Sequence, residues 1–208
     1  MTAYDVLCSQ SDEAAWKANR RTMVTASLVP TLLGLSPWEK RSVADVLRDV
    51  AIGADLEQTA SMEGGNRFES TVLGWCGDRD GRSYRRWQEL LRSREAPWLG
   101  ATPDGFVEED GRRVLVEVKC THPFGTKKEW APLTSDGPRM VPDHVQAQVQ
   151  AQLFVAGLAK AYVIHWSWGV YPQAIPVERN DRVCAAIVSA AREAWETIER
   201  IRSEAGAP

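Results

Sequence analysis

Residues Gly100–Cys120 read GATPDGFVEEDGRRVLVEVKC and contain the clearest structural pattern in the chain. Valines at 114, 116 and 118 alternate with other residues, which is the two-residue period of a β-strand. The Glu-Asp-Gly before that strand predicts a hairpin turn, and Pro103-Asp104-Gly105 predicts a tight bend where the partner strand begins. We therefore expect a β-hairpin.

We expect three charged side chains of this hairpin to converge. Glu117 and Lys119 lie two residues apart and leave the strand on the same face, and pairing across the hairpin brings Asp104 beside them. Carboxylate oxygens are hard ligands that suit Mg²⁺ or Mn²⁺, and a nearby lysine can hold a nucleophilic water or stabilise charge on phosphorus. A solvated ion pair would explain Glu117 and Lys119 as well. Charges within a valine-rich strand, however, need partners or a role.

The composition limits the class of protein. We expect the 208 residues to form one domain, 1–208, of α/β class, with 44% hydrophobic and 25% charged residues. No apolar run reaches membrane-spanning length, and the N-terminus lacks the layout of a signal peptide. Four scattered cysteines without C-x-x-C spacing argue against a zinc site or a disulfide framework, so a reducing cytoplasm is expected.

The distribution of charge is compatible with a nuclease. A net charge of −3 argues mildly against a nucleic-acid coat protein, but acidic metal ligands can offset a local basic patch. An arginine-rich stretch interleaved with Tyr84 and Trp87 suits phosphates and unstacked bases, although an exposed, salt-bridged surface explains it equally well. These arginines are Arg79, Arg82, Arg85, Arg86, Arg92 and Arg94.

Helical patterns surround the hairpin. Caps and periodicity predict helices over 11–21, 25–33, 42–52, 62–77, 143–157 and 181–203, and further strands over 161–168 and 171–177. We expect Phe68, Val72 and Trp75 to form the buried stripe of the fourth helix, with Glu69 beside it. Residues 121–142, rich in Pro, Gly and Lys, indicate a loop that could move or contact substrate.

The helix over 143–157 contains four glutamines at alternating positions. We expect Asp143 to cap it. Gln146 and Gln150 share one side of the helix, and Gln148 and Gln152 share nearly the opposite side. Because a buried amide must find hydrogen-bond partners, glutamine beside a buried row is unusual.

Five short blocks of sequence follow one another in the same order as in a known protein family. They are Trp16 and Arg20 with Val24-Thr25-Ala26-Ser27, then Gly65-Asn66-Arg67-Phe68-Glu69, Thr102-Pro103-Asp104-Gly105, Glu117-Val118-Lys119-Cys120 and Gln148-Val149-Gln150. Together they resemble the YqaJ-type viral recombinase family, the bacteriophage lambda exonuclease family, of the PD-(D/E)xK nuclease superfamily. The resemblance covers about residues 16 to 157. It implies a restriction-endonuclease-like core, with a mixed central β-sheet flanked by helices.

The resemblance implies roles for the residues around the hairpin. Asp104 and Glu117 would bind divalent metal, with the backbone carbonyl of Val118 as a further ligand. Lys119 would activate or orient the attacking water. Glu69 would complete the acidic site through metal-bound water.

Three further residues receive roles from the same resemblance. Gln150 would lie close to the site and hold water or the strand. Arg20 and Ser27 would form the pocket for the 5′-phosphate of a DNA end, which suits a helix N-terminus beside an arginine. The sequence departs from the family after Cys120, where Thr121-His122 precede a proline, and segment 127–142 matches no family block.

The implied function is a Mg²⁺-dependent deoxyribonuclease, with Mn²⁺ as an alternative ion, that degrades one strand of double-stranded DNA from its 5′ end. The implied partners are double-stranded DNA ends, a single-strand annealing protein and further copies in a homotrimer, with no membrane, in the cytoplasm of a bacterial host. One alternative is an endonuclease or CRISPR-type nuclease of the superfamily, although the iron–sulfur versions need a clustered cysteine quartet. Others are a catalytically silent DNA-end-binding module and a non-nuclease α/β domain.

Overall fold

The computed structural model describes residues 2–54, 60–121, 130, 140–167 and 170–206, with the backbone alone for 60–67 and 170. The predicted loop 121–142 therefore lies largely outside the described residues. The elements are β1 (Tyr4–Ser9), α1 (Glu13–Arg20), β2 (Val24–Thr25), α2 (Val29–Leu32), α3 (Val43–Ile52), α4 (Ala60–Asp80), β3 (Arg85–Arg86), β4 (Glu89–Ser93), β5 (Leu99–Ala101), β6 (Gly105–Glu109), β7 (Arg112–Thr121), α5 (Asp143–Ala156), β8 (Lys160–Ser167), β9 (Val170–Glu178) and α6 (Asp181–Ala205).

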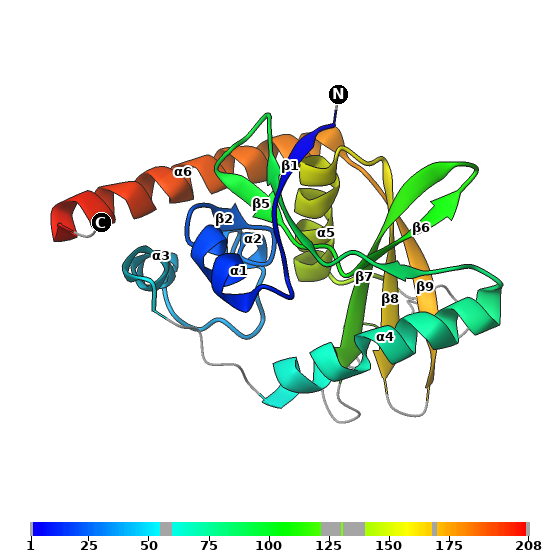
Figure 1. The fold of residues 1–208 in the computed structure, drawn as a ribbon. Helices are drawn as coiled ribbons and strands as arrows, with labels where there is room; N and C mark the ends of the chain where they lie inside the picture. Colours follow the sequence, from blue (N-terminus) through cyan, green and yellow to red (C-terminus); the bar gives the residue numbers. More distant parts are fainter. Residues whose placement is uncertain (1, 55–59, 122–129, 131–139, 168–169, 207–208) are drawn as a thin grey trace.

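The strands form two sheets, where the sequence suggested one central sheet. The smaller sheet has the order β1-β4-β5-β2, and the larger has the order β3-β6-β7-β8-β9 (Figure 1). In the larger sheet β7 runs parallel to β8 and antiparallel to β6, so the sheet is mixed. The predicted α/β class, with a mixed sheet flanked by helices, is confirmed.

The predicted hairpin is present as β6 and β7. Gly105 lies opposite Val116, and Glu109 lies opposite Arg112. Asp110 and Gly111 form the turn with φ of 50° and 72°, since a two-residue hairpin turn of this kind needs positive φ at both positions. Upstream of the hairpin, β5 belongs to the smaller sheet, so the chain passes from one sheet to the other between Ala101 and Gly105.

Helices α4 and α5 cover opposite faces of the larger sheet (Figure 1). Leu115 of β7 belongs to the same buried cluster as Val149 of α5, whereas Val116 clusters with Val72 of α4. Because side chains alternate along a strand, residues of β7 in phase with Leu115 point toward α5. Glu117 is in that phase.

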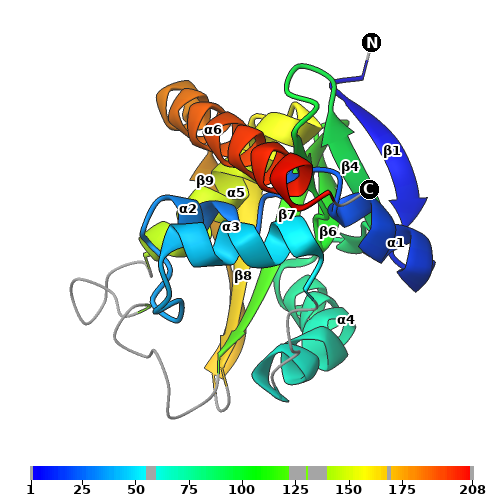
Figure 2. The ribbon, with the colours of Figure 1, turned by 90° about the vertical axis from the view of Figure 1, so that its left-hand side faces the viewer.

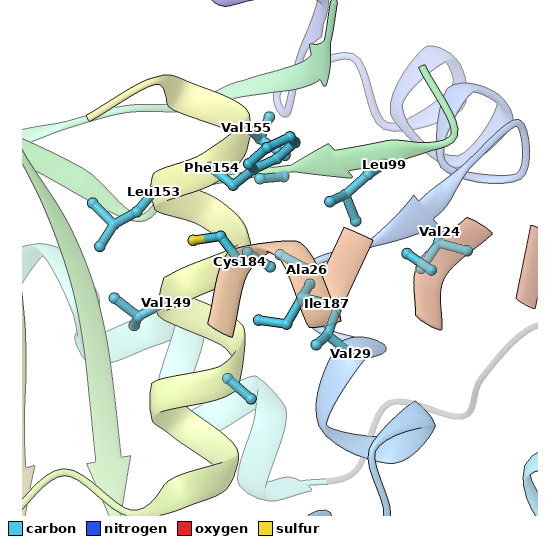
Figure 3. Close-up of a cluster of buried hydrophobic side chains, with 14 of the residues drawn as sticks. Val24, Ala26, Val29, Leu99, Val149, Leu153, Phe154, Val155, Cys184 and Ile187 are labelled. Atoms are coloured by element: carbon cyan, nitrogen blue, oxygen red, sulfur yellow. The ribbon is translucent and has the colours of Figure 1, made fainter. Parts of the chain in front are cut away.

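Helix α5 lies between the larger sheet and α6, and most of its residues are buried. Helix α6 packs across α2, α3 and α5, away from α4 (Figure 2). The core between these elements includes Val24, Ala26, Val29, Leu99, Val149, Leu153, Phe154, Val155, Cys184 and Ile187 (Figure 3). A polar side chain on α5 therefore has to find its partners inside the protein.

Several local predictions are wrong. Among the side chains of α4 that the structure describes, Val72, Leu73 and Cys76 are buried, whereas Phe68 and Trp75 are 38% and 43% exposed. Strands β1, β2, β3, β4 and β5 were not predicted. The N-cap of α5 is the residue before the predicted Asp143 cap. Of the helices in the described part of the chain, none is both long and apolar enough to cross a membrane.

Candidate active site

The site lies where β6 begins, at Gly105, and where β7 continues past Val116 without β6 as its neighbour. Beyond Val116, β7 has β8 on one side and no paired strand on the other among the described residues. The Asp104 side chain fills this position, because its Oδ2 accepts a hydrogen bond from Val118 N at 2.7 Å. Since the N–H and C=O of one strand residue point to the same side, the Val118 carbonyl faces the same gap.

Glu117 is buried and hydrogen-bonded on both carboxylate oxygens. Its residue exposure is 2%. Lys119 Nζ and Gln148 Nε2 donate to Oε1 at 2.6 and 2.7 Å, and Gln152 Nε2 donates to Oε2 at 2.7 Å. Lys119 Nζ also donates to Gln148 Oε1 at 3.1 Å. Glu117 and Lys119 are therefore not the solvated surface pair that the sequence left open.

Glu69 approaches the site from α4. Arg86 Nη2 on β3 holds its carboxylate at 3.1 Å, and the Glu69 side chain is 17% exposed. Burial raises the pKa of Glu69 above its ordinary value, and the negative charge of Glu117 raises it further, while Arg86 and Lys119 lower it. The ionisation of Glu69 therefore depends on the charges of Arg86, Glu117 and Lys119.

The carboxylates repel one another strongly enough to affect the ionisation of Asp104. Burial, and then the charges of Glu117 and Glu69, raise the pKa of Asp104 well above its ordinary value. Burial by itself lowers the pKa of Lys119, but Glu117 and Asp104 together raise it, so the ammonium stays charged. A cation placed among these carboxylates would relieve the repulsion.

These donors match the requirements of a small hard cation. Mg²⁺ is commonly held by one or two carboxylates, with water filling the remaining positions. Asp104, Glu117 and the Val118 carbonyl supply that set. Among the residues that the structure describes, no group of three or more His, Cys, Asp and Glu side chains is arranged to hold a metal. Two carboxylates and a backbone carbonyl are oxygen donors, whereas a structural zinc site is usually closed by four Cys and His side chains.

The raised pKa of Asp104 predicts that this carboxylate weakens the metal-free fold. A raised native pKa means that the unfolded state ionises more easily, so stability is lost as the pH rises through the interval between the two pKa values. We expect Asp104→Asn to raise the thermal unfolding midpoint in EDTA at neutral pH. The advantage should shrink as the pH falls from the native pKa toward about 3.9, the unfolded value.

Glu39 provides a control with the opposite sign. Hydrogen bonds from Arg41 lower the pKa of Glu39 to about 2. Glu39→Gln should therefore lower the unfolding midpoint at neutral pH, and the difference should disappear on acidification. If both variants changed the midpoint in the same direction, the account of the Asp104 environment would be wrong.

Arg20 and Ser27 lie together, as the sequence suggested. Arg20 Nη2 donates to Ser27 Oγ at 3.4 Å, and the guanidinium lies 4.3 Å from the centre of the Trp16 ring. Trp16 Nε1 donates to Thr102 Oγ1 at 3.3 Å, two residues before Asp104. These contacts connect the Arg20–Ser27 pair to the segment that leads to Asp104.

The expected helix N-terminus at Ser27 is wrong. Thr25 belongs to β2, and α2 contains only Val29–Leu32. Arg20 and Ser27 therefore meet through their side chains alone, and the Ser27 hydroxyl lies 3.1 Å from that of Thr25. Burial lowers the pKa of Arg20, which indicates a guanidinium that has lost part of its hydration.

Gln150 does not lie at the acidic site. Its Nε2 donates to Glu178 O and its Oε1 accepts from Asn180 N, both at 2.8 Å. Gln150 thus joins α5 to the end of β9 and the start of α6. The glutamines at the site are Gln148 and Gln152, which sequence reasoning placed on the opposite side of the helix from Gln150 without assigning them a role.

The arginine-rich stretch does not form one phosphate-binding patch. Arg86 alone of this stretch pairs with an acidic residue of the site, Glu69, among the described contacts. The others bind elsewhere: Arg79 to Pro172 O, Arg82 to Asp80 and Glu109, Arg92 to Thr22 Oγ1 and Arg94 to Asp5, and Arg85 is exposed. The salt-bridged alternative explains three of the six arginines, Arg82, Arg86 and Arg94.

Comparison with known proteins adds a family and a fold. Residues 15–159 match the model of the YqaJ-like viral recombinase domain. The alkaline exonuclease LHK-Exo from Laribacter hongkongensis has a TM-score of 0.70 at 22% identity, over 93% of this chain and 98% of its own. LHK-Exo in complex with dAMP gives 0.72 at 20% identity, with the same coverage.

A phage related exonuclease from Haemophilus somnus 129PT has a TM-score of 0.66 at 14% identity, over 91% of this chain and 99% of its own. At these identities the likeness concerns the fold. No curated protein gives a significant sequence match.

Proposed function

Because the chain belongs to the family of YqaJ-like viral recombinase domains, we propose that it is a nuclease, and specifically a phage-type exonuclease. The observation that carries the proposal is that Asp104, Glu117 and Lys119 lie together where β7 extends past the start of β6. The fold that the chain shares with alkaline exonucleases supports the proposal. The finer proposal is a Mg²⁺-dependent enzyme that hydrolyses one strand of double-stranded DNA from its 5′ end and leaves a 3′ single strand.

Asp104, Glu117 and the Val118 carbonyl would hold Mg²⁺, with Mn²⁺ as a substitute. Asp104 would contribute its carboxylate, whose Oδ2 also accepts the Val118 N–H. A divalent cation bound there supplies positive charge that polarises the phosphodiester and makes bound water more acidic. Hydrolysis then needs groups that orient the attacking water and stabilise charge on the phosphate oxygens.

Lys119 is the group best placed for that task. Glu117 Oε1 and Gln148 Oε1 fix its ammonium, which retains its charge and has three N–H donors. Since Glu117 and Gln148 take two of these donors, one remains. We propose that this donor orients the attacking water, while the positive charge of the ammonium stabilises negative charge as it develops on the phosphate. Glu69, held by Arg86, would bind further water around the cation.

Labelled linear and circular DNA test the function. Incubation of the purified chain with Mg²⁺ and a linear duplex carrying a 5′-phosphate should release nucleotides from the 5′-labelled strand and leave covalently closed circles intact. Cleavage of circles would favour an endonuclease instead. Binding of DNA ends without nucleotide release would favour the silent module.

Arg20 and Ser27 are proposed to bind the 5′-phosphate at the DNA end. Arg20→Met should reduce kcat/KM on 5′-phosphorylated duplex by roughly tenfold to a hundredfold, the value of a charged hydrogen bond. The loss on a duplex with a 5′-hydroxyl should be much smaller. The comparison needs steady-state rates on both substrates.

Arg21→Met is the matched control. Arg21 is the neighbouring arginine, and it donates to the backbone carbonyl of Gly53 instead of Ser27. This variant should keep the wild-type preference for phosphorylated ends. An equal loss on both substrates in Arg20→Met would contradict the assigned role.

The remaining proposals concern context. We propose that residues 1–208 act as one nuclease domain on double-stranded DNA ends in the cytoplasm of a bacterial host. A single-strand annealing protein would receive the 3′ strand. The proposed assembly is a homotrimer, and light scattering on the purified chain distinguishes it from a monomer.

A further inference from the structure

The hydrogen bonds to Glu117 leave one acceptor position open. A carboxylate has about four lone-pair positions, two on each oxygen. Lys119 and Gln148 take two on Oε1, and Gln152 takes one on Oε2. Among the described contacts, the position that remains is on Oε2.

The Gln152 side chain indicates that the hydrogen bonds from α5 to Glu117 have a role beyond filling the core. Its residue exposure is 1%, and its Oε1 has no hydrogen-bond partner among the described residues. A buried acceptor without a donor destabilises a fold, and an apolar residue of the same length would avoid that cost. What the amide does provide at this position is an N–H directed at Glu117 Oε2.

We propose that Gln148 and Gln152 restrict Glu117 to one metal bond, through Oε2, and thereby make the site select a small octahedral cation over Ca²⁺. The inference rests on the proposed function. Ca²⁺ takes more oxygen ligands than Mg²⁺ and commonly binds both oxygens of one carboxylate, whereas Mg²⁺ requires a near-ideal octahedron. With Oε1 occupied, Glu117 offers no bidentate contact. Both glutamines are positioning residues that act through Glu117.

Metal titration without DNA tests the proposal. Mg²⁺ and Ca²⁺ are titrated separately by calorimetry into the full chain and into Gln148→Met, which keeps the side-chain length and frees a position on Oε1. The ratio of the Ca²⁺ to the Mg²⁺ dissociation constant should fall by about tenfold or more, the scale on which groups behind a metal ligand act.

Gln146→Met is the matched control. Gln146 lies on the same helix, and its Nε2 donates to Val141 O. This variant should keep the wild-type ratio. An unchanged ratio in folded Gln148→Met, or an equal change in both variants, would overturn the proposal.

Crystals of the wild-type chain decide the matter if Gln148→Met does not fold. Soaked separately with Mn²⁺ and Ca²⁺, they should show a single Glu117–metal bond through Oε2, and binding through Oε1 or through both oxygens would overturn the inference. Failure of the proposed function looks different. In that case the wild-type chain binds neither ion, or Asp104→Asn binds Mg²⁺ as the wild type does.

Discussion

Lys119→Met is expected to lower kcat for DNA hydrolysis by about a hundredfold to a thousandfold, the effect of removing one group that stabilises developing negative charge. Lys119 Nζ is the cation held directly against Glu117, at 2.6 Å. Methionine keeps much of the side-chain volume but can neither orient water nor supply positive charge near the phosphate. Single-turnover rates on a 5′-phosphorylated duplex at saturating Mg²⁺ measure the effect on chemistry.

Lys160→Met is the matched control for this prediction. Lys160 lies on β8 of the same sheet, pairs with Glu109 at 2.8 Å and has the same side-chain exposure as Lys119, 29%. It should retain the wild-type rate. Near-normal hydrolysis by Lys119→Met would show that Lys119 has no part in the reaction.

Asp104→Asn is expected to weaken Mg²⁺ binding by more than about a hundredfold, because a direct ligand should matter more than the groups behind it. Hydrolysis should be lost with it. The amide oxygen can still accept the Val118 N–H, so the strand junction is preserved while a ligand charge is removed. Calorimetric titration of Mg²⁺ and nucleotide release measure the two effects.

Asp110→Asn is the control on the same hairpin. Asp110 has a φ of 50°, a conformation that asparagine tolerates as well as aspartate, and it lies in the turn at the far end of β6. It should bind Mg²⁺ and cleave DNA as the wild type does. Asp104→Asn with unchanged Mg²⁺ affinity would contradict the ligand assignment.

The hairpin could be predicted because its signals are local. Alternating valines specify the strand, and Glu109-Asp110-Gly111 supplies residues that accept positive φ. The phase of the same alternation places Glu117 and Lys119 on one face. No tertiary information is needed for these steps.

The error over Gln150 has a different origin. A helix advances by about 100° per residue, so residues two apart lie on nearly opposite sides. That rule separates Gln148 and Gln152 from Gln146 and Gln150, but it does not say which pair faces the sheet. Only the packing of α5 between the larger sheet and α6 decides which pair faces the sheet. The resemblance favoured Gln150, whereas the structure places Gln148 and Gln152 beside Glu117.

The smaller sheet and the exposed aromatics were missed because their signals are weak. Strands β2 and β5 contain only two and three residues, too few to show a period. On α4, Phe68 and Trp75 follow a helical period with Val72, yet they lie at the margin of the buried face and contact Trp166. Periodicity identifies a face but not its limits.

The location of a bound divalent cation decides whether Asp104 and Glu117 form a metal site. Crystals of active protein soaked with Mn²⁺ and measured at the manganese absorption edge should show an anomalous peak between the carboxylates of Asp104 and Glu117, beside the Val118 carbonyl. A peak elsewhere, with this junction empty while the protein still cleaves DNA in Mn²⁺, would contradict the account.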